Sequence, residues 1–460
     1  MTLDEYIVSL KDKRVAVLGI GVSNLPLVEL LLRAGVSVTA CDKRIKTQLG
    51  DTAVRLEAMG AELHLGHGYL QELDHDVIFR TPGLHPFTRE IREAKERGSL
   101  VTSEMEVFFS VCPCKTIAVT GSDGKTTTTT IIAELLRAEG YTVHLGGNIG
   151  TPLLYEAPNM TPGDIAVLEL SSFQLHSMHC RPDIAVITNV SPNHLDVHPD
   201  MGDYVDAKKQ IFKNQSAEDR LVLNLDDPYT PELVSEVGGS PRYFSVKQAV
   251  TNGAFYENGT LYLAEDGAAS ELMSRADILL PGDHNVQNYL AAFAATAGLI
   301  GTDTRRRVAG SFAGVAHRLE LIRTLRGVSY YNDSIASSPT RTIAGLRSFT
   351  KKPILIAGGY DKNIPFDILG EEIVRRVKAV FLTGATAEMI KTAITNAPGY
   401  DASELPIEVV DDFTGAVLAA HKLASEGDTV LLSPACASFD RFTNFAQRGD
   451  FFREIVLGLA

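Results

Sequence analysis

Cysteine is scarce in this sequence, and long apolar runs are absent from it. The 460 residues include five cysteines, an odd number without a C-x-x-C pair, so neither a disulfide framework nor a zinc knuckle is indicated. Reduced thiols in a cytoplasmic compartment are the simplest interpretation. No apolar run reaches the ~18 residues of a membrane-spanning helix, and the acidic N-terminus lacks the apolar segment of a signal peptide. We therefore expect a cytoplasmic protein without membrane insertion.

Positive charge is also in short supply. Lysine and arginine number 43 against 57 aspartates and glutamates, which gives a net charge of −14. A chain this acidic repels phosphate backbones and anionic lipid, so we expect no general binding to nucleic acid or membranes. A local cationic site for phosphate remains compatible with this charge.

Short apolar runs alternate with helical patterns in three successive blocks of the chain. This alternation is typical of α/β domains with mostly parallel sheets. At about 100–200 residues per domain, the length accommodates three domains. We predict them at residues 1–103, 104–314 and 315–460, with a basic, glycine-containing linker around residues 305–314.

Individual elements follow from the same patterns. Helices are expected at 25–33, from the loop after residue 120 to about 138, and at 288–299, with Gly35 and Gly140 ending the first two. A hairpin at 255–263 is expected to turn at Asn258-Gly259. Strands are expected at 14–20, 36–41, 76–80, 115–120, 165–170, 183–189, 221–224, 353–357, 379–383, 407–410 and 429–433.

The strongest local signal is TGSDGKTT at residues 120–127, between a predicted strand and a predicted helix. Its glycines let backbone N–H groups approach a phosphate, while the helix N-terminus and Lys125 add positive charge. Thr126 or Thr127 can offer a hydroxyl to Mg²⁺. The loop is shorter than the usual GxxxxGKS/T pattern, because Val119 stands at the place of its first glycine. A phosphate site is favoured over a tight turn with a solvated lysine.

A weaker signal lies near the N-terminus. Residues 19–24 resemble GxGxxG with Asn24 in the third place, and Asp42 ends the next strand, where a ribose-binding acid sits in dinucleotide sites. Because the third glycine normally allows close helix–strand packing, its absence counts against NAD. A UDP site and an ordinary turn without ligand both stay open.

Polar groups also follow two later strands of the central block. Glu169 at a strand end, opposite the phosphate loop, is a reasonable Mg²⁺ ligand. His194, Asp196 and His198 alternate, but no matching ligand set supports a transition-metal cluster, so contact of His194 with a metal or substrate is preferred. Taken alone, Lys208 reads as a solvated helix residue.

The last block carries Gly/Ser-rich turns with arginine and lysine, a composition that suits an anionic ligand. These turns are His317-Arg318, Asn332-Asp333-Ser334, residues 358–362 and residues 433–445. Cys436 lies in the last of them. We assign it no nucleophilic role, because no partner histidine can be identified.

Eight motifs in this order resemble the Mur ligase family over nearly the whole chain: TGSDGKTTT, GGNIG, ELSSFQL, NVSPNHLD, YVDAK, HRLE, NDSIAS and SPACASFDRFTNFAQRG. ELSSFQL and the last motif resemble in particular the members that add D-glutamate to UDP-N-acetylmuramoyl-L-alanine. The resemblance implies an N-terminal Rossmann-like domain for the UDP-linked substrate, a central P-loop-type ATPase and a C-terminal Rossmann-like amino-acid-binding domain. It also implies a monomeric, cytoplasmic ligase of peptidoglycan precursor synthesis that forms an acyl phosphate.

The resemblance further implies roles for single residues. Catalytic roles fall to Lys125, His194 and Lys208. ATP is expected at Gly121, Ser122, Asp123, Gly124, Lys125, Thr126, Thr127, Asn285, Arg318 and Asp333. The UDP substrate is expected at Ser23, Asp42, Lys43 and Asn148, and D-glutamate at Ser337, Lys362, Ser438 and Phe445. Two Mg²⁺ ions are expected at Thr126, Glu169, His194 and a carbamylated Lys208.

The family pattern is not matched everywhere. Tyr360 interrupts a common GGxxK pattern, Ile335 occupies a position that is often basic, and the choice of Lys208 over Lys209 rests on the YxxAK match. Three other functions stay open. A nicotinamide-dependent dehydrogenase leaves the phosphate loop unexplained, and NADH titration tests it. A regulatory nucleotide-binding module would not turn over ATP. A folate-polyglutamating ligase normally lacks the N-terminal domain.

Overall fold

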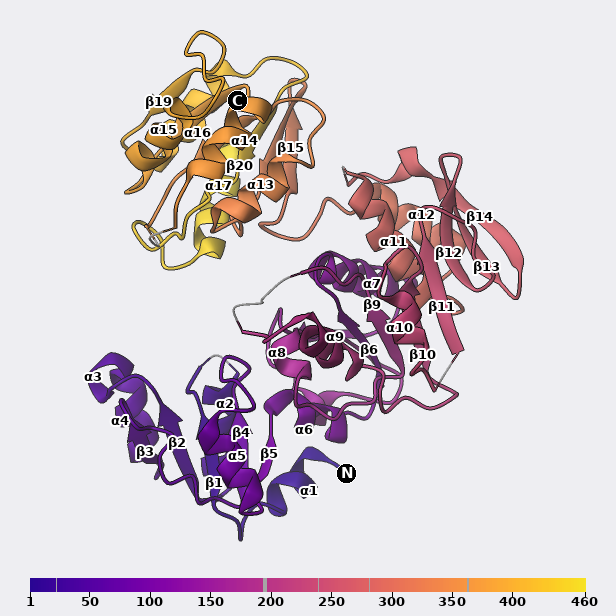
Figure 1. The fold of residues 1–460 in the computed structure, drawn as a ribbon, viewed down its shortest axis with the longest axis vertical. Coiled ribbons are helices and arrows are strands. Elements are labelled where there is room, and N and C mark those ends of the chain that lie inside the picture. Colours follow the sequence, from indigo (N-terminus) through magenta and orange to yellow (C-terminus); the bar gives the residue numbers. More distant parts are fainter. Residues whose placement is uncertain (22, 193–196, 239, 281, 362–363) are drawn as a thin grey trace. The chain divides into compact units, whose positions relative to one another are not determined.

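The computed structural model describes residues 1–21, 23–192, 197–238, 240–280, 282–361 and 364–460. The chain forms two compact units, one of residues Met1–Asp277 with His284–Gly310, the other of Ile278–Asp283 with Ser311–Ala460. Three sheets are found in these described parts, two in the first unit and one in the second (Figure 1). The prediction of an α/β chain with mostly parallel sheets is confirmed.

The N-terminal sheet has the order β3-β2-β1-β4-β5, and its pairings are parallel. This is the order of a doubly wound fold, in which ligands bind where the order reverses, between β1 and β4. Buried apolar side chains cover both faces of the sheet. The strands are β1 Val15–Leu18, β2 Val38–Asp42, β3 Glu62–Leu65, β4 Val77–Arg80 and β5 Leu100–Thr102. The helices are α1 Leu3–Val8, α2 Asn24–Arg33, α3 Lys46–Leu49, α4 Asp51–Ala58 and α5 Arg89–Glu96.

The central sheet has the order β14-β13-β12-β11-β10-β9-β6-β8-β7. Strands from β7 to β12 pair in parallel, whereas β12, β13 and β14 form an antiparallel meander. The strands are β6 Lys115–Thr120, β7 Val143–Gly147, β8 Ile165–Glu169, β9 Ile184–Ile187, β10 Arg220–Asn224, β11 Ser240–Ser245, β12 Gly253–Glu257, β13 Thr260–Glu265 and β14 Ala268–Ser274. The helices are α6 Glu104–Val111, α7 Lys125–Glu139, η1 Ala157–Asn159, α8 Ser172–Leu175, α9 Met201–Lys209, α10 Thr230–Val234, η2 Arg275–Asp277, α11 Asp283–Ala295 and α12 Thr302–Ser311.

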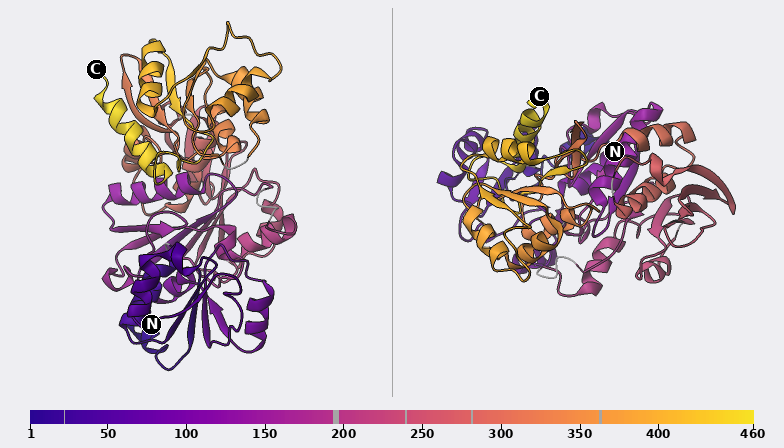
Figure 2. Two further views of the ribbon diagram at one scale, coloured as in Figure 1. Left: turned by 90° about the vertical axis from the view of Figure 1, so that its left-hand side faces the viewer. Right: turned by 90° about the horizontal axis from the view of Figure 1, so that it is seen from above.

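The third sheet has the order β15-β16-β20-β17-β18-β19, with only β15 antiparallel to its neighbour. One apolar core includes residues of α13 to α15, and another includes residues of α16 and α17. Figure 2 shows the orange to yellow part of the chain, with helices on both sides of its strands. The strands are β15 Glu320–Leu325, β16 Val328–Asn332, β17 Ile354–Ala357, β18 Ala379–Leu382, β19 Ile407–Val409 and β20 Thr429–Leu432. The helices are α13 Pro339–Leu346, α14 Asp367–Arg376, α15 Ala387–Thr395, α16 Phe413–Leu423 and α17 Phe445–Gly458.

Two local predictions can be compared with the structure. The hairpin turn is confirmed, since Asn258 and Gly259 have φ of 48° and 85° between the paired residues of β12 and β13. The linker around residues 305–314 is confirmed only as a boundary, because the first unit ends at Gly310, whereas most of the stretch belongs to α12. Arg305 is buried there, with its guanidinium 5.9 Å from the ring centre of Phe293. The basic residues therefore gave no indication in the sequence that this segment is a packed helix.

No helix in the described part of the chain is long and apolar enough to span a bilayer.

Candidate active site

The predicted phosphate loop joins β6, an interior strand of the central sheet between β9 and β8, to α7 (Figure 1). Gly124 caps the helix with φ of 76°, and a Cβ there would lie 2.3 Å from Oδ1 of Asn288. Gly121 has φ of 148°, and its Cβ would lie 1.9 Å from Oγ1 of Thr188. Both positions therefore require glycine, and the bare backbone opens toward the helix N-terminus, where anions are stabilised.

The neighbouring strand end holds the loop in shape. Oγ1 of Thr188 donates to the carbonyl of Asp123 at 2.6 Å, and Oδ1 of Asn189 accepts the Asp123 N–H at 2.9 Å. Oγ of Ser122 donates to the carbonyl of Ser191 at 3.0 Å and contacts the hydroxyl of Tyr204 at 3.0 Å. Loop residues are thus tied to β9 and α9 by side-chain contacts, which fixes their backbone before any ligand arrives.

Two lysines point at the loop. Nζ of Lys125 donates to the carbonyls of Gly121 and Ser122, both at 2.9 Å. Nζ of Lys208 donates to the same Gly121 carbonyl at 2.8 Å and lies 4.3 Å from the ring centre of Tyr204. Burial, and then the charge of Lys125, lower the pKa of Lys208 well below its ordinary value. Lys208 is therefore not the solvated helix residue that its sequence alone suggested.

Lys209, the alternative to Lys208 as the lysine of the YxxAK motif, has a different environment. Its ammonium forms ion pairs with Asp206, Glu232 and Glu236 at 2.8 to 3.1 Å. Burial alone would lower the pKa of Lys209, but these carboxylates raise it. A lysine held as a cation by three acids has a structural role, so the geometry favours Lys208 as the reactive one.

Glu169 ends β8, directly beside β6 in the sheet. Its Oε1 accepts a hydrogen bond of 2.8 Å from Nδ2 of Asn148. Its Oε2 is buried and has no hydrogen-bond partner among the described residues. A buried carboxylate oxygen without a partner next to a phosphate loop fits a hard cation such as Mg²⁺, which prefers oxygen ligands.

Other predicted ATP residues of the first unit lie on α7 and α11. Thr126 and Thr127 are buried in the first turn of α7. Asn285 accepts a hydrogen bond of 3.0 Å from Nδ2 of Asn288, whose Oδ1 accepts one from Thr128. Asn288 thus connects Asn285 to α7. His194 lies outside the described residues.

The predicted UDP-binding residues follow β1 and β2. Oδ2 of Asp42 accepts the Ile20 N–H at 2.8 Å and pairs with Arg44. Burial alone would raise the pKa of Asp42, but these contacts hold it below its usual value. Lys43 is exposed, and the carbonyl of Ser23 accepts the hydroxyl of Tyr155 at 3.0 Å. Asp42 therefore shapes the glycine turn.

Asn24 explains how the turn does without its third glycine. Its Nδ2 donates to the carbonyl of Leu18 at 3.1 Å, and the side chain is buried. Asparagine therefore connects α2 to the end of β1 by a hydrogen bond at the position where glycine would allow direct packing.

In the second unit, Asp333 is buried between β16 and β20. Its Oδ2 accepts a 2.7 Å hydrogen bond from Ser433, and Oδ1 accepts the Leu319 N–H at 3.3 Å. Burial raises the pKa of Asp333 to about 7. The positive charge of Arg318 opposes this rise in pKa but does not overcome the effect of burial.

The loops that carry the predicted amino-acid-binding residues meet in this unit. Ser337 lines a small hollow together with Ala435 and Cys436. Ser438 is buried two residues further on, while Phe445 is partly exposed and lies 6.1 Å from His317, ring centre to ring centre. Lys362 lies outside the described residues.

Sequence reasoning missed Arg448, which holds these loops together. Its buried guanidinium donates to the carbonyls of Ser334, Cys436 and Ala437 at 2.8 to 3.2 Å. Burial lowers the pKa of Arg448 to about 10. Its place in the last motif of the sequence did not reveal the contact with Ser334, 114 positions away.

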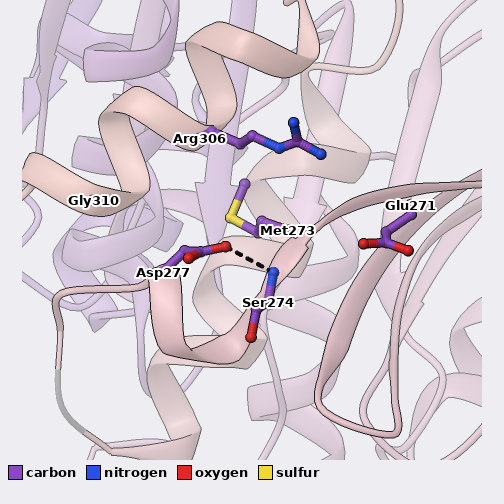
Figure 3. A pocket seen from close by; sticks show the side chains of 6 residues that line it. All are labelled: Glu271, Met273, Ser274, Asp277, Arg306 and Gly310. Atoms are coloured by element: carbon purple, nitrogen blue, oxygen red, sulfur yellow. Dashed lines mark hydrogen bonds between the residues drawn. The ribbon is translucent and has the colours of Figure 1, made fainter.

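A separate hollow of about 510 Å³ lies between β14 and α12 (Figure 3). Glu271, Met273 and Asp277 line it on one side and Arg306 on the other. Arg306 donates to the carbonyl of Leu272, and the Ser274 N–H donates to Asp277. None of the predicted site residues lines this hollow, so the phosphate loop, with its built contacts, is the better candidate for the reaction centre.

Comparison with known families gives matches along most of the chain. The models for the Mur ligase MurD-like N-terminal domain, the Mur ligase middle domain and the Mur ligase glutamate ligase domain match residues 13–103, 119–296 and 317–436. The UDP-N-acetylmuramoylalanine–D-glutamate ligase of Acetivibrio thermocellus is 51% identical over 458 residues, 99% of this chain and 98% of that protein. The protein of that name from Clostridium kluyveri is 48% identical over 454 residues, 98% of each chain.

Solved structures share the fold. The UDP-N-acetylmuramate-alanine ligase of Thermotoga maritima has a TM-score of 0.56 at 18% identity, covering 97% of this chain and 99% of that one. The MurF ligase of Thermotoga maritima in complex with ADP has a TM-score of 0.55 at 18% identity, covering 99% and 97%.

Proposed function

The chain belongs to the Mur ligase family, and from this premise we propose that it joins D-glutamate to UDP-N-acetylmuramoyl-L-alanine with the hydrolysis of ATP. The observation that carries the substrate assignment is the 51% identity, over 99% of the chain, to a ligase named for these two substrates. The product would be a precursor of peptidoglycan, formed by a monomeric enzyme in the cytoplasm.

The proposed reaction begins with the carboxylate of the UDP-linked substrate attacking the γ-phosphorus of ATP. The bond from that phosphorus to the β–γ bridging oxygen breaks, which gives an acyl phosphate and ADP. The amine of D-glutamate then attacks the acyl carbon, loses a proton and expels phosphate. Because the first step brings two anions together, positive charge at the phosphate loop is the main requirement.

Lys125 supplies that charge at the N-terminus of α7, where the helix adds partial positive charge. Residues 121 to 127 would hold the phosphates, and Asn285, Arg318 and Asp333 would orient the nucleotide. Support comes from the two glycines that admit no side chain and from the ties to Thr188 and Asn288. These contacts preorganise the loop, so little energy is spent ordering it during the reaction.

Glu169, Thr126 and His194 are the proposed Mg²⁺ ligands, for two ions in all. The unpartnered Oε2 of Glu169 supports its part in this. When bound, Mg²⁺ would neutralise charge on the phosphate oxygens and the attacking carboxylate. Lys208 would complete the set after carbamylation, in which its neutral amine adds to carbon dioxide, an N–C bond forms and a proton leaves. The lowered pKa of Lys208 supports this step, because only a neutral amine is nucleophilic.

The two other substrates are proposed to bind away from the loop. Ser23, Asp42, Lys43 and Asn148 would contact the UDP-linked substrate, and Ser337, Lys362, Ser438 and Phe445 would contact D-glutamate. We retain residues 1–103, 104–314 and 315–460 as the proposed domains. Since substrates held on separate domains must meet, domain closure would be part of the cycle.

One assay tests the proposal. The purified chain is given ATP, Mg²⁺ and UDP-N-acetylmuramoyl-L-alanine, and phosphate release is compared for D-glutamate, L-glutamate, L-alanine and meso-diaminopimelate. Release should require the UDP-linked acceptor and be fastest with D-glutamate. A preference for another amino acid would overturn the substrate assignment, and phosphate release without any amino acid would overturn the ligase assignment.

A further inference from the structure

Three side chains near the phosphate loop form a second cluster that the proposed reaction does not use. His176 ends α8, His198 precedes α9, and Asp203 lies in the first turn of α9. Their ligand atoms all lie within 4.8 Å of one another. We propose that His176, His198 and Asp203 bind a divalent transition-metal ion of the Zn²⁺ type.

The carboxylate of Asp203 lies between the two imidazoles. Its Oδ1 is 2.8 Å from Nε2 of His176, and its Oδ2 is 2.6 Å from Nδ1 of His198. Zn²⁺ binds histidine nitrogen and carboxylate oxygen at about 2.0–2.2 Å, so small side-chain rotations bring all three groups to one ion. Without an ion, the same groups hold one another through hydrogen bonds.

The surroundings favour one ligand arrangement. The other ring nitrogen of His198, Nε2, lies 3.0 Å from Oγ of Ser172, and a proton shared there leaves Nδ1 as a metal ligand. The ring of Phe173 stacks on His198 at 5.7 Å between centres, and Phe87 meets His176 edge-on at 4.9 Å. Aromatic walls of this kind limit water and hold the imidazoles in place.

The side that faces solvent is the carboxylate. The side chain of His198 is fully buried and that of His176 is 7% exposed, whereas that of Asp203 is 26% exposed. An ion would therefore enter past Asp203. With three protein ligands, its fourth coordination position would remain open for water. Two imidazoles and one carboxylate suit zinc, cobalt or nickel rather than Mg²⁺, which separates this cluster from the oxygen ligands proposed around Glu169.

An ion at this place would cross-link two elements that carry parts of the candidate active site. Helices α8 and α9 pack against each other (Figure 1). Helix α8 follows the strand that ends in Glu169, and α9 carries Lys208. Binding should therefore stabilise the central domain against heat, since an ion that binds only the folded chain raises its stability. This inference does not depend on which amino acid the enzyme uses.

The test uses the full chain, stripped of metal by a chelator and kept in excess Mg²⁺ so that hard-cation sites are filled. Co²⁺ is the spectroscopic probe, and Zn²⁺ is the competitor. We expect one Co²⁺ per chain with visible d–d absorption, displaced by Zn²⁺, and an upward shift of Tm with Zn²⁺. His176→Gln and Asp203→Asn should each lower the association constant at least about tenfold.

His64→Gln is the matched control, because His64 also lies beside a carboxylate, 3.2 Å from Glu62, but belongs to no group of three metal-ligating side chains among the described residues. It should bind Co²⁺ like the unmodified chain. Circular dichroism checks each variant for folding, and either of the two site variants suffices if the other does not fold. The Tm shift of the unmodified chain provides a measurement that needs no variant.

Three results would overturn the proposal. One is the absence of both d–d absorption and a Tm shift. Another is unchanged binding in both site variants, which would mean an adventitious ion only. The third is thiolate charge-transfer absorption that disappears in Cys112→Ser, which would place the ion at Cys112 and Cys114, whose sulfurs are 3.5 Å apart.

Discussion

Lys125 and Lys208 donate to the same oxygen, the carbonyl of Gly121, at 2.9 and 2.8 Å. Two ammonium groups on one carbonyl repel each other, and the more deeply buried one loses its proton more easily. The pKa of Lys208 is lowered by burial and by Lys125 together. The loop thus has beside Lys125 a second lysine, Lys208, whose amine is easily deprotonated.

Lys125→Ala should leave the fold intact and nearly abolish turnover. The variant removes the charge that lies over the loop, and loss of one preorganised charge lowers kcat by about 10²–10³-fold. D-Glutamate-dependent phosphate release is the measurement, and Lys213→Ala, which removes an exposed lysine, is the control. Normal release by Lys125→Ala would remove the phosphate-loop assignment.

Lys208→Met should abolish carbamylation without leaving a large cavity. We expect a carbamate signal in ¹³C NMR under ¹³CO₂ for the unmodified chain, because burial favours the neutral amine that adds to carbon dioxide. The signal should disappear in Lys208→Met together with most of kcat. Lys209→Ala should keep the signal, since three carboxylates hold Lys209 protonated. A signal that follows Lys209 would reverse the assignment.

Glu169→Gln should raise the Mg²⁺ requirement. The substitution keeps the size of the side chain but removes the charge from a buried oxygen that has no partner among the described residues. We expect the Mg²⁺ concentration for half-maximal rate to rise at least about tenfold, the scale of losing support at a metal site. A Mg²⁺ titration of the rate measures it, beside the exposed Glu156→Gln. An unchanged titration curve would exclude Glu169 as a ligand.

Gly124→Ala should abolish ATP binding by steric conflict. Its new Cβ would lie 2.3 Å from Oδ1 of Asn288 at a φ of 76°, so the loop must move. Gly140→Ala is the matched control, because it also has positive φ, 108°, but meets open space. That control should lose only about 1–2 kcal/mol of stability and keep its ATP affinity by calorimetry. Adding Asn288→Ala to Gly124→Ala should restore part of the ATP binding. If it restored none, backbone strain at positive φ, and not the contact with Asn288, would be the cause of the loss.

The elements around the phosphate loop were predictable, and others were not. The strand at 115–120 was predicted to the residue, because a continuous apolar run ended by glycine leaves little choice. Strands β3 and β5 were missed, since they lie at the edges of their sheet, are short and bury little. Helix α12 was predicted as a linker because its arginines suggested an exposed, charged segment. The apolar stem of an arginine can nevertheless be buried, as that of Arg305 is.

The residues of the candidate site could be predicted only where they are close together in the sequence. The order of residues 120–127 alone was enough to predict a phosphate site there. The groups that hold the loop, Thr188 and Asn288, lie more than 60 and 160 positions away, and an asparagine or threonine carries no signal of such a contact. Likewise, the sequence placed His198 in an alternating set with His194, whereas the fold brings it to His176 and Asp203.

Asp333→Asn should change how the stability of the C-terminal unit depends on pH. Burial raises the pKa of Asp333 to about 7 from an ordinary value of 3.8. Between these values the folded chain holds a proton that the unfolded chain has released. The carboxyl group therefore contributes stability that is fully present below about pH 4 and is lost as the pH rises through about 7.

In the asparagine variant this loss cannot occur, because the side chain does not titrate. Relative to the unmodified chain, Asp333→Asn should thus become more stable as the pH rises from about 4 to about 7. Hydrogen exchange of residues 328–332 and 429–432, the two strands that flank Asp333, measures the difference in the full chain. Asp411→Asn, an exposed site, should show no such trend. If Asp333→Asn and Asp411→Asn gave parallel curves, the buried carboxyl would be ionised throughout, and Arg318 rather than burial would control its charge.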